Sequence, residues 1–182
     1  MLELKKELEK IKGSFSRISE IVYQTPVLSS ISINKALKAD ITFKAECLQE
    51  TGSFKLRGAS SAISVLSKEE KSRGVVAFSS GNHAQGIAYA SRELGTSAKI
   101  VMPSDAPKIK IWKTQEYGAE VIFYERDEDN REEIGFSIAI EEGRKLIKPF
   151  DDLNVIYGQG TAALEVMNEV DTKFDMSVVC CS

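Results

Sequence analysis

The spacing of apolar and polar residues predicts a chain in which strands and helices alternate. Uniformly apolar runs at 75–80 and 98–103 are typical of buried parallel strands, and residues 41–48 alternate like a half-buried strand. Two further strands are predicted at 119–125 and 176–181. Helical spacing predicts an amphipathic N-terminal helix in MLELKKELEKIKG and later helices over 54–67, 82–95, 107–117, 129–147 and 161–170.

This order of elements predicts an α/β fold with a parallel sheet and right-handed crossovers. We place a small α/β domain at 53–148, the N-terminal part of a larger domain at 1–52, and a return into that larger domain at 149–182. Linker composition does not mark these boundaries. The chain stops straight after its last apolar strand, so two interpretations stay open: a sheet whose last strand is terminal, or a protein cut within a domain.

Composition narrows the class of protein. The 182 residues are 42% hydrophobic and 28% charged, as in a soluble globular protein with a real core. A net charge of −3 with dispersed basic residues predicts no nucleic-acid partner, and no apolar run is long enough for a membrane partner. Three cysteines, Cys47, Cys180 and Cys181, form no disulfide or metal pattern, and the last two fall on the predicted buried strand at 176–181. The expected compartment is therefore cytoplasmic.

The stretch ETGSFKLRGASSA (50–62) puts two cations at a predicted helix start. Thr51 to Ser53 have the residue types of a turn and an N-cap, so Lys55 and Arg57 fall in the first turn. The helix dipole disfavours cations there by roughly 0.3–1 kcal/mol each. A helix N-terminus, a neighbouring Arg57 and partial burial would lower the pKa of Lys55, as a Schiff-base lysine requires. The alternative is a solvated surface lysine.

The segment SSGNHAQG (79–86) joins a predicted strand to a predicted helix. It is no Walker loop, because Ile87 and Ala88 stand where Lys and Ser or Thr belong. The exposed N–H groups of the helix start suit an anion, and a carboxylate fits as well as a phosphate. The alternative is an ordinary capped loop. His83, the only histidine, is more often structural, since it has neither a second metal ligand nor a nucleophile elbow nearby.

Taken together, ECLQETGSFKLRGA and SSGNHAQG resemble the fold-type II pyridoxal phosphate enzymes, in the branch of serine/threonine dehydratases, serine racemases and hydroxyaspartate dehydratases. The resemblance continues through TPVLSS, VMPSDAPKIKIWKTQEYGAEVIFY and PFDDLNVIYGQGTAALEV, in order along nearly the whole chain. It implies a two-domain, parallel-sheet α/β fold of the tryptophan synthase β-subunit type, with the larger domain truncated.

The resemblance also implies site residues. Lys55 would hold pyridoxal 5'-phosphate as a Schiff base and then remove the Cα proton, with Phe54 beside the ring and Asn82 on its ring hydroxyl. The substrate carboxylate would be received by the loop of Ser79, Ser80, Gly81, Asn82 and His83.

Two of the implied roles distinguish branches of the family. Ser80 matches a second acid/base on the opposite face of the substrate. Arg131, in DEDNREEIG, matches an arginine that binds a carboxylate in the racemase and hydroxyaspartate dehydratase members, a task suited to guanidinium. The alternative for Arg131 is a solvated charge run at a helix start.

The activity implied is dehydration of L-threonine or L-serine to 2-oxobutanoate or pyruvate and ammonia, with a homodimer or homotetramer as the full-length form. Serine racemase and 3-hydroxyaspartate dehydratase are the nearest alternatives, and an inactive truncated remnant or a binding paralogue is the alternative of another class. The family's glycine-rich phosphate loop and the racemases' Mg²⁺ or Ca²⁺ site would follow Ser182, and we assign no metal ligand within the chain. We therefore expect residues 1–182 alone to be inactive.

Overall fold

Four parallel strands form the main sheet, in the spatial order β5-β4-β3-β6. A computed structural model describes residues 2–171 and 173–180. The strands are β3 (Val75–Phe78), β4 (Ala98–Pro103), β5 (Glu120–Tyr124) and β6 (Lys145–Leu146). All three pairings between them are parallel. The parallel sheet that the sequence predicts is therefore confirmed, and the carboxyl ends of its strands lie along one edge.

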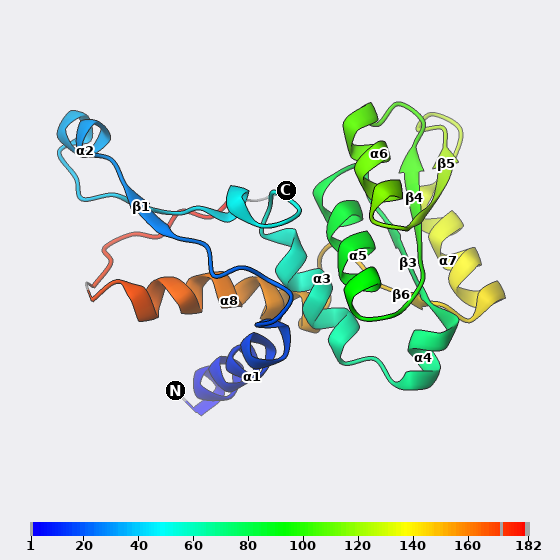
Figure 1. Ribbon diagram of the computed structural model, residues 1–182, viewed down its shortest axis with the longest axis horizontal. Helices are drawn as coiled ribbons and strands as arrows, with labels where there is room; N and C mark the ends of the chain where they lie inside the picture. Colours follow the sequence, from blue (N-terminus) through cyan, green and yellow to red (C-terminus); the bar gives the residue numbers. More distant parts are fainter. Residues whose placement is uncertain (1, 172, 181–182) are drawn as a thin grey trace.

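Helices cover both faces of this sheet (Figure 1). α5 (Asn82–Glu93) and α6 (Lys108–Glu116) lie on one face, and α7 (Arg131–Glu142) lies on the other. Along β3, Val75 and Ala77 join the core beneath α5, whereas Phe78 joins a second cluster with Ile134 of α7. Because both faces are covered, every residue of β3 is buried, which explains its continuous apolar run.

The rest of the chain is mostly helical. It contains α1 (Leu2–Ile18), α2 (Ile31–Leu37), α3 (Lys55–Ser64), α4 (Lys68–Arg73) and α8 (Leu153–Glu169). A two-stranded antiparallel sheet, β1 (Val27–Ser29) with β2 (Thr42–Lys44), carries α2 between its strands, and a 3₁₀ turn, η1 (Glu46–Leu48), follows. α3 packs against both α5 and α8, so it joins the sheet layer to the helical layer (Figure 1).

Several helix boundaries differ from the sequence prediction. The helix predicted at 54–67 ends at Ser64, and a second helix, α4, forms where a charged connection was expected, with a capping box between Ser67 and Glu70. α7 ends at Glu142 because Gly143 adopts φ +63°, which leaves residues 145–146 to pair with β3. α8 starts at Leu153 rather than at 161, because the Asp152 carboxylate caps it.

Two strand predictions were wrong. Within 41–48 only Thr42–Lys44 is a strand, and the 3₁₀ turn takes the remainder. Residues 173–180 form no strand, and Met176 and Val178 are exposed, as is Cys180; Cys181 lies outside the described residues. An apolar run becomes a strand only where a neighbouring strand receives its backbone hydrogen bonds. The domain boundaries at 52 and 148 stay a prediction.

In the part of the chain that the structure describes, no helix combines the length and hydrophobicity needed to cross a bilayer.

Candidate functional site

The starts of α3 and α5 meet at the position of Lys55. Gly86 of α5 lies against the Lys55 backbone, where a Cβ atom would come within 3.2 Å of the Lys55 carbonyl carbon and oxygen. The absence of a side chain at Gly86 thus lets the two helices approach closely. The tertiary structure thereby places the predicted cofactor lysine beside the first two turns of α5, which begins within the segment SSGNHAQG.

The Lys55 side chain is half-buried. Its Nζ lies 5.2 Å from the centroid of the Phe54 ring. Burial lowers the pKa of Lys55, since desolvation disfavours the ammonium form. Ser53 does not cap α3 as predicted: Phe54 occupies the N-cap position without a side-chain bond. The Ser53 hydroxyl is instead buried with no hydrogen-bond partner among the described residues.

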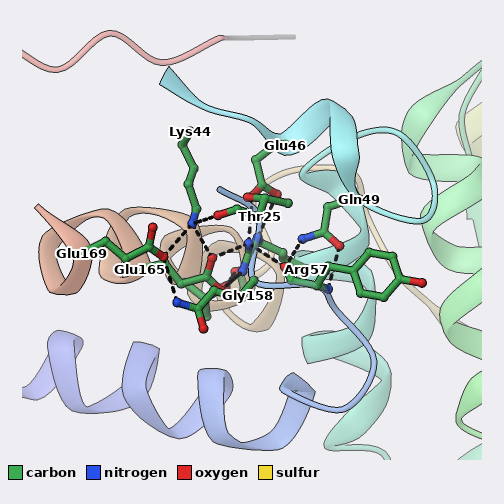
Figure 2. Close-up of polar contacts among 11 residues, drawn as sticks. Thr25, Lys44, Glu46, Gln49, Arg57, Gly158, Glu165 and Glu169 are labelled. Carbon is green, nitrogen blue, oxygen red and sulfur yellow. Dashed lines mark hydrogen bonds and ion pairs between the residues drawn. The ribbon is translucent and has the colours of Figure 1, made fainter. Parts of the chain in front are cut away.

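Arg57 does not act on Lys55 as the sequence suggested. It is completely buried, and its guanidinium donates to Glu165 at 2.7 Å and to Glu46 at 2.8 Å. Figure 2 shows this buried cluster, in which Lys44 also pairs with Glu165, at 2.7 Å. Two carboxylates therefore neutralise the Arg57 cation, and burial is the cause that lowers the pKa of Lys55. The role of Arg57 is to tie α3 to η1 and α8.

The loop before α5 has the form of an anion site. Gly81 is the N-cap residue of α5 and supplies no side-chain cap. The Ser79 hydroxyl accepts a hydrogen bond from the Gly81 N–H at 3.2 Å, and Ser79 and Ser80 are partly exposed. N–H groups in the first helical turn have no partner within the helix, so they are available to a carboxylate.

Asn82 is exposed at the first position of α5, and its Oδ1 accepts a hydrogen bond from Lys110 Nζ at 2.6 Å. The same ammonium donates to Gln85 Oε1 at 3.1 Å. Sequence reasoning missed Lys110, because KIKIWK contains three lysines and nothing in that pattern separates one from another. Only the packing of α6 on α5 selects it.

His83 is buried, and its Nε2 lies 3.3 Å from the carbonyl oxygen of Ile147. Burial, together with the nearby charge of Lys55, lowers the pKa of His83 to about 4. The imidazole is therefore neutral near pH 7. Nε2 thus has a partner after the end of β6, whereas Nδ1 is buried with no hydrogen-bond partner among the described residues; in the loop itself, His83 presents its backbone N–H.

Arg131 is the first residue of α7, and its guanidinium lies 5.6 Å from the centroid of the Phe78 ring. Phe78 ends β3 and directly precedes Ser79, so Arg131 stands at the carboxyl edge of the sheet near the loop. The structure groups seven of the residues predicted for the site around the starts of α3 and α5, and it places Arg131 against Phe78 at the carboxyl edge of the sheet. The seven are Phe54, Lys55, Ser79, Ser80, Gly81, Asn82 and His83.

These residues fit an aldehyde cofactor with anionic groups. Lys55 is a half-buried amine of lowered pKa, the α5 start is uncapped, and the buried hydroxyl of Ser53, two residues before Lys55, lacks a partner among the described residues. An orphaned buried hydroxyl is expected to find a partner when a ligand binds. Among residues 2–171 and 173–180, no three His, Cys, Asp or Glu side chains gather as metal ligands.

Comparisons with known proteins identify the family. The family model described as "Pyridoxal-phosphate dependent enzyme" matches residues 18–182. L-threo-3-hydroxyaspartate ammonia-lyase of Saccharomyces cerevisiae is 52% identical over 85% of this chain and 48% of its own length. Serine racemase of Schizosaccharomyces pombe is 44% identical over 94% of this chain and 53% of its own length.

Solved structures show the same fold. The crystal structure of serine racemase from Dictyostelium discoideum matches with a TM-score of 0.86 and 44% identity, over 91% of this chain and 54% of that one. The chain thus spans about half the length of the relatives it matches and belongs to the family of pyridoxal-phosphate dependent enzymes.

Proposed function

We propose that this chain carries the lysine and carboxylate-binding part of a pyridoxal phosphate-dependent ammonia-lyase for small β-hydroxy amino acids, of which L-threonine and L-serine are the first candidates. The supporting observation is the contact between the starts of α3 and α5. It sets a half-buried amine of lowered pKa beside an uncapped helix N-terminus.

The cofactor, when bound, would supply the electron sink that makes the Cα proton acidic. Lys55 would bind the cofactor aldehyde and afterwards take the Cα proton. The backbone N–H groups of the loop 79–83 would orient the substrate carboxylate, and the Ser80 hydroxyl would serve as acid on the opposite face. Loss of the β-hydroxyl as water, followed by hydrolysis, releases a 2-oxo acid and ammonia, so the atoms balance.

Covalent trapping tests the assignment of Lys55. The purified 182-residue chain is incubated with pyridoxal phosphate, reduced with borohydride and digested for peptide mapping. We expect the pyridoxyl group on Lys55, because its amine is deprotonated more readily than exposed amines. Lys55→Ala should remove this label, and Lys68→Ala, which removes an exposed lysine, should retain it. A label spread evenly over many lysines would contradict the proposal and favour a non-catalytic chain.

Turnover is measured on the full-length gene product as release of 2-oxo acid from L-threonine, L-serine and threo-3-hydroxyaspartate. Release abolished by Lys55→Ala would support the lyase. Conversion of L-serine to D-serine without 2-oxo acid would favour a racemase instead.

A second candidate substrate, 3-hydroxyaspartate, is favoured by Arg131. A guanidinium at the carboxyl edge of the sheet suits the second carboxylate of that substrate. We expect Arg131→Met to lower kcat/KM for hydroxyaspartate at least tenfold more than for serine. Arg126→Met is the matched control, because Arg126 is exposed and pairs with Asp105. Equal losses for both substrates would count against this role.

A further inference from the structure

The Lys110 ammonium bridges two side-chain amides on the first turn of α5. It donates to Asn82 Oδ1 at 2.6 Å and to Gln85 Oε1 at 3.1 Å. Asn82 and Gln85 are three residues apart, so they share one face of α5. We propose that Lys110 is a positioning residue that fixes the orientation of the Asn82 amide toward the cofactor; this proposal rests on the proposed function.

The chemistry of an ammonium settles which amide atom faces it. A protonated lysine has three donors and no acceptor, so the Asn82 atom at 2.6 Å is the carbonyl oxygen. The Asn82 Nδ2 group is then directed away from Lys110, and it has no hydrogen-bond partner among the described residues. Without Lys110 the amide would be free to rotate by half a turn.

Apart from these two hydrogen bonds, the charge of Lys110 lies in an electrostatically unfavourable place. A cation near a helix N-terminus opposes the helix dipole. Two amide oxygens aimed at the ammonium offset this repulsion, and Gln85, which supplies one of them, is buried. This arrangement leaves both N–H donors of the Asn82 Nδ2 group unpaired among the described residues, and one of them would serve the ring hydroxyl of the cofactor.

A donor at this point selects the ionised form of the ring hydroxyl. A phenolate oxygen can only accept hydrogen bonds, and an N–H polarised by a neighbouring ammonium is a stronger donor. A flipped amide would present its oxygen and favour the neutral hydroxyl. Through Asn82, Lys110 would therefore favour the ionised form of the ring hydroxyl when the cofactor is bound.

The test uses the pyridoxyl group fixed on Lys55 by borohydride, since this adduct cannot dissociate. The ring hydroxyl is titrated by its ultraviolet absorption. We expect Lys110→Met to weaken its ionisation about tenfold, which is one pKa unit. Lys110→Arg, which keeps a donor, should retain most of the effect. Lys113→Met, one turn along α6, is the matched control and should change nothing.

A double-mutant cycle separates positioning from a direct effect of charge. If Lys110 acts through Asn82, Lys110→Met should have no further effect in the Asn82→Ala background. An undiminished effect in that background would overturn the positioning role, as would an unchanged titration in Lys110→Met itself.

A further experiment without the cofactor tests the Lys110–Asn82 contact separately from the proposed function. The chain has five asparagines, so ¹⁵N-asparagine labelling with Asn82→Ala identifies the Asn82 amide by NMR. Lys110→Met should shift that resonance, and Lys113→Met should not. If Lys55 is never trapped but this shift occurs, the proposed function fails and the Lys110–Asn82 contact stands. Absence of the shift refutes the contact and, with it, the inference.

Discussion

Arg57 is the residue whose loss should disturb the interior most directly. Its guanidinium is completely buried and held by Glu46 and by Glu165, which is itself 2% exposed. We expect Arg57→Met to lower the free energy of unfolding by about 3–5 kcal/mol, because Glu46 loses its guanidinium partner and the buried Glu165 keeps only its ion pair with Lys44. Urea denaturation of both proteins measures the difference.

The control for this prediction is Arg73→Met. Arg73 also pairs with a carboxylate, that of Glu69, but both side chains are exposed. Such pairs contribute less than about 1 kcal/mol. Similar losses in the two variants would show that the Arg57 cluster is solvated and that its burial carries no special penalty.

His83 should make stability depend on pH between 6.5 and 4. Its pKa falls from 6.5 in the unfolded chain to about 4 when buried, so the unfolded chain binds a proton first as the pH drops. The contribution of His83 to the pH dependence therefore leaves the free energy of unfolding at its full value above pH 6.5. Toward pH 4 it lowers the free energy of unfolding progressively, by about 3 kcal/mol in total.

The measurement is urea unfolding of wild type and His83→Gln at pH 7.0, 5.5 and 4.5. The slope that His83 contributes should be missing in the variant, and carboxylates that titrate at the acid end act equally on both proteins. Parallel curves for the two proteins over this range would refute the assignment of a buried neutral imidazole.

At the scale of elements, the approach of α3 to α5 depends on Gly86. A Cβ there would lie 3.2 Å from the Lys55 carbonyl group and 3.3 Å from the Leu56 nitrogen, all atoms of a helical backbone that cannot move aside cheaply. We expect Gly86→Ala to lower stability by about 1–3 kcal/mol, the usual range for overpacking. It should also reduce borohydride trapping at Lys55.

Gly13→Ala is the matched substitution in α1. Its Cβ would meet one Arg17 nitrogen at an ordinary 3.4 Å. With space available, replacing a helical glycine by alanine should raise the free energy of unfolding by about 0.5–1 kcal/mol. Changes of the same sign at both positions would mean that α3 yields to the added methyl group.

At the scale of the whole molecule, the arm formed by α2 and the β1–β2 pair exposes apolar side chains. Leu28 and Phe43 face each other across the two strands at 49% and 44% exposure, and Ile31 is 88% exposed. Contiguous exposed apolar surface promotes association. We expect the 182-residue chain to self-associate, and Leu28→Thr with Phe43→Thr to weaken that association about tenfold by sedimentation velocity. Ile140→Thr, on α7, is the control; equal weakening there would show that the arm is not the contact.

The sequence by itself determined the elements whose cause is local. The apolar run of β3 predicted a strand covered on both faces, and small residues predicted the helix that became α5. The quoted motifs around Lys55 and Ser79 were enough to indicate the family, because several of them occur in order along the chain.

Tertiary structure decided what depends on partners distant in sequence. Arg57 looked like a free cation until η1 and α8 brought Glu46 and Glu165 to it, and Lys110 resembled its neighbouring lysines until α6 packed on α5. The apolar run at 176–181 predicted a strand, yet its described residues adopt no strand conformation. Local spacing encodes which face a residue presents, whereas charge pairing and strand pairing depend on what the fold brings to that face.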